Sequence, residues 1–313
     1  MAPVDRRTAL VAILALTVVA GAAGCEQQTE DAALTAGLLV LSGDVGSVTL
    51  RVRDDGGSRG RRIELPDPAT SWVAAGRANV LLATLVDGST YVSDPLGDDD
   101  PEWRLVEPVT SNDRPPEPPL FFGTWDPPGG AYAQLGADFS GNSGMRAVVT
   151  DPALEQAVEV TMDERDALPA PAAWIDDDRI VLISGEGDAT GAMIIDSATQ
   201  EFEPGPAGVR LVATSGDAQM AAAWPGPDRE VEVLATEAWL AGEPSNVRVA
   251  PPDGSSMPVV MALDEPGDRL AVVWADDEGT PTTITVHAAS RDWARVATLE
   301  LGEASAATVA WLR

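Results

Sequence analysis

Short runs of alternating apolar and polar residues fill most of the chain after residue 37. The clearest unit is residues 171–197, PAAWIDDDRIVLISGEGDATGAMIIDS, in which an acidic turn and a glycine-rich loop separate three short apolar runs. Residues 48–53, VTLRVR, alternate strictly, which is typical of a strand with one face in water. Glycine and proline are plentiful, at 29 and 25 residues, and aromatic residues make up only 5% of the chain. The pattern predicts an all-β protein of many short strands joined by tight turns.

The strand pattern repeats along the chain. The runs that we interpret as the second strand of each unit begin near residues 38, 80, 132, 179, 220 and 270, at spacings of 42, 52, 47, 41 and 50 residues. A repeat of this length with four strands is typical of a β-propeller blade. The first unit lacks an opening strand, and residues 308–312 form a last strand without a unit. Pairing this C-terminal strand with the N-terminal strand at residues 38–41 predicts a closed six-bladed β-propeller.

Two alternatives to the six-bladed ring stay open at this point. Seven blades would fit if residues 88–119 contained further strands. A tandem of two-sheet sandwiches would also use many short strands of this kind.

Several pieces of the repeat resemble those of a known family. The strand–turn–strand pieces resemble the repeat of TolB-type and related WD40-like periplasmic β-propellers, and two further pieces look like the corners between the third and fourth strands of such blades. The resemblance spans most of residues 37–312, and it implies a fold but no activity. The strand–turn–strand pieces are WDPPGGAYAQL, WIDDDRIVLI and LDEPGDRLAVVW, and the corner pieces are IIDSATQEFEP and VTDPALEQAVEV.

The N-terminal residues carry the pattern of an export signal. Arg6 and Arg7 precede an apolar run over residues 9–20, and small residues follow up to Cys25. Cysteine directly after Ala-Gly resembles the lipobox of bacterial lipoproteins, and the resemblance implies cleavage before Cys25 and attachment of a diacylglycerol, such as one with palmitate, to its sulfur. An uncleaved anchor is the alternative, but the apolar run is shorter than the roughly 20 residues of a spanning helix.

These patterns divide the chain into three parts. Residues 1–24 are predicted to be a lipoprotein signal peptide, residues 25–36 the lipidated cysteine and a polar tether, and residues 37–313 the β-propeller. We therefore expect an exported protein that is anchored to the outer face of the cytoplasmic membrane.

Charge narrows the range of partners. The formal net charge is −30, from 50 acidic and 20 basic residues, and every basic residue is arginine. A field of this sign repels phosphate backbones, which excludes nucleic acids as partners, and membrane attachment requires a covalent anchor because anionic headgroups are repelled too. The absence of lysine excludes a P-loop and Schiff-base chemistry, and a single cysteine excludes an intramolecular disulfide.

Few residues are candidates for chemistry. His287, the only histidine, is predicted to face water on a strand over residues 283–287, and zinc sites with two or more histidines are excluded. Acidic clusters at residues 98–100, 163–166, 176–178 and 276–278 offer the oxygen ligands that Ca²⁺ prefers or carboxylate pairs for glycoside hydrolysis. The same residues favour tight turns. We expect turns to be their main role, with Ca²⁺ binding as the alternative.

The tryptophans and the long connections complete the list of candidates. Residues 107–119 and 239–245 are the longest connections, and Trp239 with Leu240 in the second is predicted to form an apolar contact with a partner. Six other tryptophans are predicted to pack between blades, and these are Trp72, Trp125, Trp174, Trp224, Trp274 and Trp311.

The sequence predicts a binding or scaffold role. We expect a monomeric, lipid-anchored, extracytoplasmic propeller at the bacterial cell envelope that binds an envelope protein, a peptide or a glycan, with Cys25 as the one assigned site and no catalytic residue. A Ca²⁺-dependent lactonase-like or glycan-processing enzyme that uses the central channel is one alternative, and an accessory subunit of a transport or secretion system is another. Acidic residues that converge on the channel would favour the enzyme, whereas a bare channel and an apolar rim would favour binding.

Overall fold

The computed structural model describes most of the chain after residue 32. The described residues are 33–53, 60–75, 80–85, 89–96, 99–106, 122–125, 132–137, 145–150, 157–162, 170–176, 179–184, 190–196, 199, 201–226, 230–253, 255, 257–302 and 304–312. Cys25 and the predicted signal peptide therefore lie outside the described residues.

Nearly all regular structure in the described residues is β-strand, and the strands form six four-stranded antiparallel sheets. Each sheet follows in hydrogen-bonded order. The first is β24 (Ala306–Trp311), β1 (Leu38–Gly43), β2 (Thr49–Arg53) and β3 (Arg61–Glu64). The second is β4 (Ala69–Ala75), β5 (Val80–Leu85), β6 (Thr90–Ser93) and β7 (Trp103–Val106). The third is β8 (Phe122–Trp125), β9 (Tyr132–Ala137), β10 (Met145–Thr150) and β11 (Ala157–Met162).

The other three sheets follow the same pattern. The fourth is β12 (Ala170–Trp174), β13 (Arg179–Ser184), β14 (Gly191–Asp196) and β15 (Phe202–Ala207). The fifth is β16 (Leu211–Thr214), β17 (Met220–Trp224), β18 (Val231–Ala235) and β19 (Val247–Val249), with the short helix α2 (Thr236–Leu240) between its last two strands. The sixth is β20 (Met257–Leu263), β21 (Arg269–Ala275), β22 (Pro281–Ala288) and β23 (Arg295–Glu300), with the 3₁₀ turn η2 (Ala289–Arg291) before β23.

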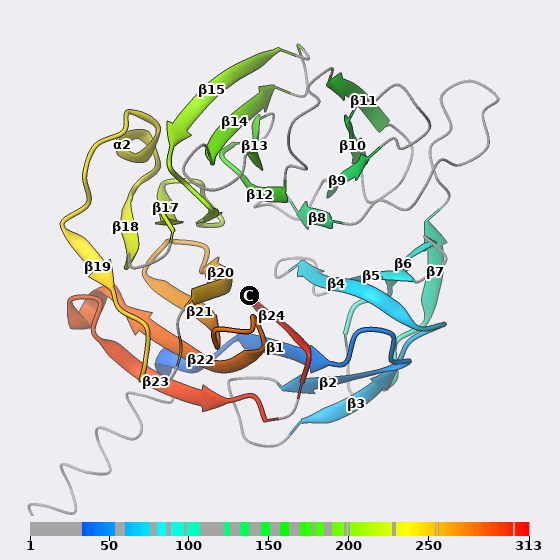
Figure 1. Ribbon diagram of the computed structural model, residues 1–313. Coiled ribbons are helices and arrows are strands. Elements are labelled where there is room, and N and C mark those ends of the chain that lie inside the picture. Colours follow the sequence, from blue (N-terminus) through cyan, green and yellow to red (C-terminus); the bar gives the residue numbers. More distant parts are fainter. Residues whose placement is uncertain are drawn as a thin grey trace, which may run out of the picture.

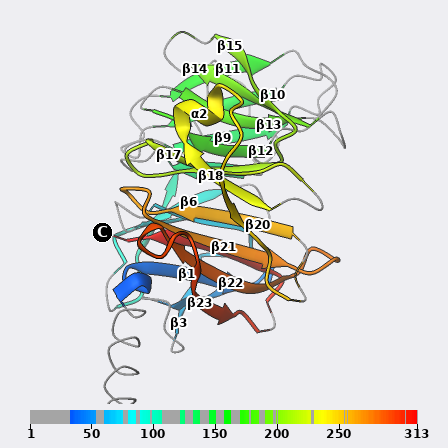
Figure 2. The ribbon, with the colours of Figure 1, turned by 90° about the vertical axis from the view of Figure 1, so that its left-hand side faces the viewer.

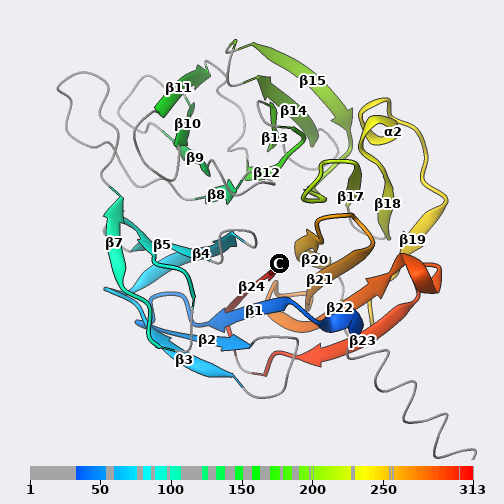
Figure 3. The same ribbon diagram turned by 180° about the vertical axis from the view of Figure 1, so that it is seen from behind.

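The sheets are arranged around a common axis. The strands β4, β8, β12, β16, β20 and β24 contact one another in that cyclic order and form the innermost ring. Figure 1 shows the remaining strands of each sheet fanning outward from this ring, and Figure 3 shows the same order from behind. The protein is an all-β β-propeller, as the repeat predicted.

The two ends of the chain meet in one sheet. β24 pairs antiparallel with β1 from Leu38 opposite Trp311 to Gly43 opposite Ala306, and the Leu312 N–H donates a hydrogen bond to the Gly37 carbonyl. The pairing expected between the C-terminal and N-terminal strands is therefore present. Residues 89–106 supply β6 and β7 of the second sheet, while residues 107–121, where the seven-bladed alternative would need more strands, lie outside the described residues.

The propeller has two ends, which we name by one residue each. The Ala36 face is the end where β1 begins and β24 ends, and the Val45 face is the opposite end, which carries the turn between β1 and β2. Figure 2 views the ring from the side, with the C-terminus and the residues that lead into β1 at the same end.

The hydrophobic core lies between neighbouring sheets and not within any one of them. Leu38 and Val40 of β1 pack with Val273 and Ile284 of the sixth sheet, whereas Leu39, on the other face of the same strand, packs toward the second sheet. β21 is buried along nearly its whole length on both faces. Burial on both faces is the difference from a sheet with one side in water, and it determines where the polar residues discussed below lie.

Candidate functional site

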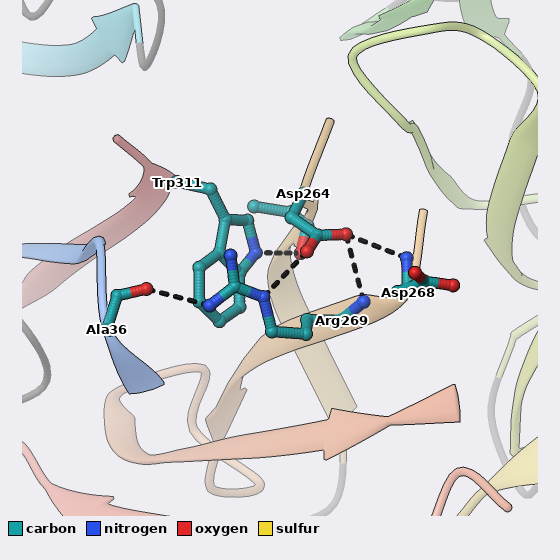
Figure 4. Close-up of polar contacts among 6 residues, drawn as sticks. Ala36, Asp264, Asp268, Arg269 and Trp311 are labelled. Carbon is teal, nitrogen blue, oxygen red and sulfur yellow. Dashed lines mark hydrogen bonds and ion pairs between the residues drawn. The ribbon is translucent and has the colours of Figure 1, made fainter. Parts of the chain in front are cut away.

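The best-defined polar arrangement among the described residues lies on the Ala36 face, where the ring closes (Figure 4). Asp264 directly follows the innermost strand β20, Arg269 begins β21, and Trp311 ends β24. The tight turn from β20 to β21, D-E-P-G-D-R, places the carboxylate of Asp264 beside the guanidinium of Arg269. We call these three residues with Ala36 the closure cluster.

Every charged group of the closure cluster has partners. Asp264 Oδ1 accepts hydrogen bonds from the backbone N–H groups of Asp268 and Arg269, at 2.8 and 2.9 Å. Asp264 Oδ2 accepts one from Arg269 Nε at 2.6 Å. Arg269 Nη1 donates to the Ala36 carbonyl at 2.7 Å, and the guanidinium lies 4.3 Å from the centre of the Trp311 ring.

The closure cluster joins three parts of the chain that are far apart in sequence. Trp311 Nε1 donates to the Ala262 carbonyl of β20 at 3.0 Å, so the C-terminal strand is tied to the sixth sheet both by this bond and by the cation–π contact. Because the carboxylate and the guanidinium are fully engaged, the arrangement is suited to holding the ring closed and not to proton transfer. The sequence piece LDEPGDRLAVVW indicated the turn, but no local signal pointed to Trp311 or Ala36 as partners.

The acidic clusters form turns wherever the structure describes them. Asp176 Oδ1 accepts the Arg179 N–H at 2.8 Å and its Oδ2 accepts Arg179 Nε at 2.6 Å. Asp276 Oδ1 accepts the N–H groups of Glu278 and Thr280, at 3.0 and 2.9 Å. The turn role is therefore confirmed for Asp176 and Asp276. Within the described residues no three His, Cys, Asp or Glu side chains gather as they would around a metal ion.

Part of the acidic set cannot be placed. Residues 98, 163–166 and 177–178 lie outside the described residues, whereas Asp99 and Asp100 are described and exposed.

The prediction that His287 faces water was wrong. Its side chain is only 5% exposed, because the third strand of a blade is covered by the neighbouring sheets on both faces. His287 Nδ1 lies 3.0 Å from the Trp293 carbonyl, which can only accept, so Nδ1 carries the proton and donates. Nε2 then accepts from the Thr285 hydroxyl at 3.0 Å, and that hydroxyl accepts from Trp274 Nε1 at 2.7 Å.

The surroundings of His287 keep its ring neutral. Burial lowers the pKa of His287 to about 4; the Trp293 hydrogen bond opposes this and the nearby Arg295 charge adds to it. Both ring nitrogens are engaged in a chain of hydrogen bonds that ends on a backbone carbonyl. The histidine is therefore a core residue whose polar atoms are satisfied, with no nucleophile beside it.

The packing prediction for the tryptophans is confirmed for the side chains that the structure describes. Trp72, Trp174, Trp224, Trp274 and Trp311 are at most 7% exposed, and the side chain of Trp125 lies outside the described set.

The partner contact predicted at Trp239 was wrong. Trp239 is 4% exposed and belongs to the core between the fourth and fifth sheets, and Leu240 packs against the same core. The reason is that residues 236–240 form α2, which folds back onto β15, β17 and β18. The other long connection, residues 107–119, lies outside the described residues.

The innermost strands carry no titratable side chain. Along their described lengths β4, β8, β12, β16, β20 and β24 contain no Asp, Glu, Arg, His, Cys or Tyr, and their polar residues are serine and threonine. The charge of the protein is therefore carried by the turns and the outer strands.

The Val45 face carries exposed apolar side chains that the sequence did not single out. Val45 and Val48 are 54% and 47% exposed. Their turn is fixed, because the Val45 N–H donates to Ser305 Oγ at 2.9 Å and the Gly46 N–H donates to the Ala69 carbonyl at 2.8 Å. Two valines are thus held in water on a rigid turn.

Membrane attachment is not addressed by the folded part. Cys25, the one site residue that the sequence assigned, lies in residues 1–32, outside the described residues. Among the helices that are described, none has the length and apolar character needed to cross a bilayer.

Comparison with solved structures finds other β-propellers. The chain aligns with TolB from Acinetobacter baumannii with a TM-score of 0.59 and 13% identity, over 88% of this chain and 66% of that chain. It thus spans just under two thirds of the length of that protein. It aligns with a putative TolB from Agrobacterium tumefaciens with a TM-score of 0.52 and 11% identity, over 84% and 89% of the two chains.

A chain of a nidogen/laminin complex is similar to the same degree, with a TM-score of 0.58 and 9% identity over 88% of this chain and 98% of that chain. No protein-family profile matches the chain, and no curated protein sequence matches it. The resemblance to TolB-type propellers is therefore confirmed for the fold, and at these identities it shows the fold alone.

Proposed function

We propose that this protein is a monomeric, lipid-anchored, six-bladed β-propeller that binds or scaffolds another molecule at the bacterial cell envelope. The six four-stranded sheets and the pairing of β24 with β1 support a six-bladed ring. The signal pattern that ends at Cys25 supports export and anchoring.

The observation that carries the binding role is the chemistry of the innermost strands. General acid–base catalysis and Ca²⁺ binding both need carboxylates or other titratable groups that converge on one point. The six strands around the axis supply none of these groups along their described lengths. A channel lined by alanine, valine and threonine favours a rigid support for loops over an enzyme that uses its central mouth.

The Val45 face is the proposed place of contact. Exposed apolar side chains on a fixed turn lose little conformational entropy on binding, because the turn is already ordered. Val45 and Val48 also lie at the end of the ring opposite Ala36, and so away from the tether. An envelope protein with an apolar patch fits this position.

Site-specific crosslinking tests the binding role. A photoreactive phenylalanine analogue is placed at Val48 in the full chain, and illumination of intact cells is expected to join it to one discrete partner protein. The matched control is Thr298, an exposed residue of the outer strand β23, which is expected to give no such product. Equal products at both positions, or none at Val48, would contradict the proposed contact face.

The anchor is tested at Cys25. Cys25→Ser is expected to abolish incorporation of labelled palmitate and to move the exported protein from the membrane fraction into the soluble fraction, because serine has no thiol to accept the diacylglycerol. The measurement is labelling together with cell fractionation, with the wild-type chain as reference. Unchanged membrane association of Cys25→Ser would show that another segment attaches the protein.

A further inference from the structure

Four arginines lie close together on the outer part of the first sheet, in a protein with a net charge of −30. Arg51 and Arg53 belong to β2, and Arg61 and Arg62 belong to β3, the last strand of that sheet. Arg51 and Arg62 are exposed, Arg61 is half-buried, and Arg53 is only 9% exposed. We call these four residues the arginine surface.

The arginine surface is arranged at a cost. Arg51 and Arg62 are direct cross-strand partners, and like charges in that position destabilise a sheet. Burial lowers the pKa of Arg53, and the charge of Arg51 lowers it further. The ion pairs among the described residues join Arg179, Arg248 and Arg269 to carboxylates, and none of them includes the arginine surface.

The contacts that these arginines do make are with neutral carbonyl groups. Arg53 Nη1 donates to the Glu300 carbonyl at 2.9 Å, and Arg61 Nη1 donates to the Asp99 carbonyl at 2.8 Å. Arg53 Nε is buried and has no hydrogen-bond partner among the described residues. A buried donor without a partner destabilises the fold, so a group of four cations with this defect is better explained by a negatively charged ligand than by packing.

The position of the arginine surface indicates which ligand this is. Strand register places Arg53 opposite Val40, and Arg61 opposite Val52 beside it. These residues therefore lie toward the Ala36 face of the first sheet, at the end where the tether enters β1. Residues 26–36 span about 36 Å at full extension, so a lipid on Cys25 would keep this end of the ring near the membrane.

We propose that the arginine surface binds the phosphate groups of anionic lipids in the membrane that carries the anchor, and so turns the Val45 face away from that membrane. This proposal rests on the lipid anchoring proposed above. The strongly acidic body does not prevent the contact, because at physiological salt charges more than about 8 Å from the headgroups are largely screened. The exposed arginines on an outer strand also suit a broad charged surface better than a small enclosed ligand.

The experiment measures binding to vesicles without the anchor. The chain of residues 26–313 retains every residue that the structure describes, including all six sheets, and it carries no lipid when Cys25 is absent. Its sedimentation is compared with vesicles of phosphatidylglycerol and phosphatidylcholine at 1:1 and with vesicles of phosphatidylcholine alone, in about 50 mM salt.

The expected result has three parts. Wild type binds the anionic vesicles and not the neutral ones. Arg51→Gln/Arg62→Gln weakens this binding about 25-fold, since each arginine at an anionic surface contributes about fivefold. Arg248→Gln, which also removes an exposed arginine from the outermost strand of a sheet, leaves it unchanged. A thermal midpoint of the double variant at or above that of wild type would show that the arginines serve binding and not stability.

Each other outcome overturns the proposal. Equal binding by the double variant and wild type, or an equal loss in Arg248→Gln, would show that the arginine surface is not the contact. Competition by about 20 mM inorganic phosphate together with a raised thermal midpoint would assign the site to a small free anion and not to a membrane. Because the assay needs no acylation, its result is separate from the Cys25→Ser test, and the failure of one can be distinguished from the failure of the other.

Discussion

Replacing Asp264 by alanine is expected to lower the free energy of unfolding by about 3–5 kcal/mol, the usual cost of removing one partner of a buried ion pair. The Asp264 carboxylate is 4% exposed and Arg269 is 24% exposed. The variant leaves the Arg269 guanidinium without a counter-charge and removes the acceptor of two backbone N–H groups. Urea unfolding of residues 26–313, followed by circular dichroism, gives the difference. The loss would fall on the contact that ties the C-terminal strand to the rest of the ring.

The same turn recurs in the fourth sheet and provides the control. Asp176 and Arg179 are joined by the same 2.6 Å contact, but their side chains are 41% and 36% exposed. Asp176→Ala is therefore expected to cost only about 1 kcal/mol, because exposed ion pairs contribute little in water. Equal losses in Asp176→Ala and Asp264→Ala would show that the closure cluster contributes nothing beyond an ordinary turn.

Acidification from pH 6.5 to pH 4 is expected to remove about 3 kcal/mol of stability through His287 alone. The pKa of His287 is about 4 in the folded protein, against an ordinary value of 6.5. Between these values the unfolded chain binds a proton that the folded chain does not, so the stability falls as the pH falls, and it becomes constant below about pH 4. The physical cause is that a charged ring would be buried and that its Nε2 would lose the Thr285 hydrogen bond.

The variant His287→Gln isolates this contribution from that of the carboxylates. Its stability at pH 7 is expected to be lower, but its loss between pH 6.5 and 4 should be smaller than that of wild type by about 3 kcal/mol. Direct observation is also simple, since the chain has one histidine and one imidazole signal by NMR. A midpoint near 6.5 in the folded protein, or identical pH profiles of the two proteins, would show that the ring is accessible to water.

Local sequence patterns were sufficient for much of the fold. Alternation over four to six residues, with turn residues between, identified most of the strands because each strand's pattern is contained in its own residues. The incomplete units at the two ends predicted that residues 308–312 would pair with residues 38–41, since an unpaired strand leaves backbone groups without partners. Asp176 and Asp276 were likewise predicted as turn residues, because an aspartate bonds to backbone groups a few residues away.

The candidate sites were predicted less well, because their contacts are between distant residues. The turn before Arg269 is local, but Ala36 and Trp311 reach it only when the ring closes. The exposed pair Val45 and Val48 carries no motif, and its exposure depends on what the neighbouring sheet leaves uncovered.

The sequence by itself determined the all-β class, the repeat, the joining of the chain's ends and the signal pattern that ends at Cys25. Only the tertiary structure decided which side chains are in water. Alternation separates the two faces of a strand but does not say what covers either face, and in a propeller each sheet is covered on both. That is why His287 lies in the core among Thr285, Trp274 and Trp293, and why Trp239 packs beneath α2 in place of meeting a partner.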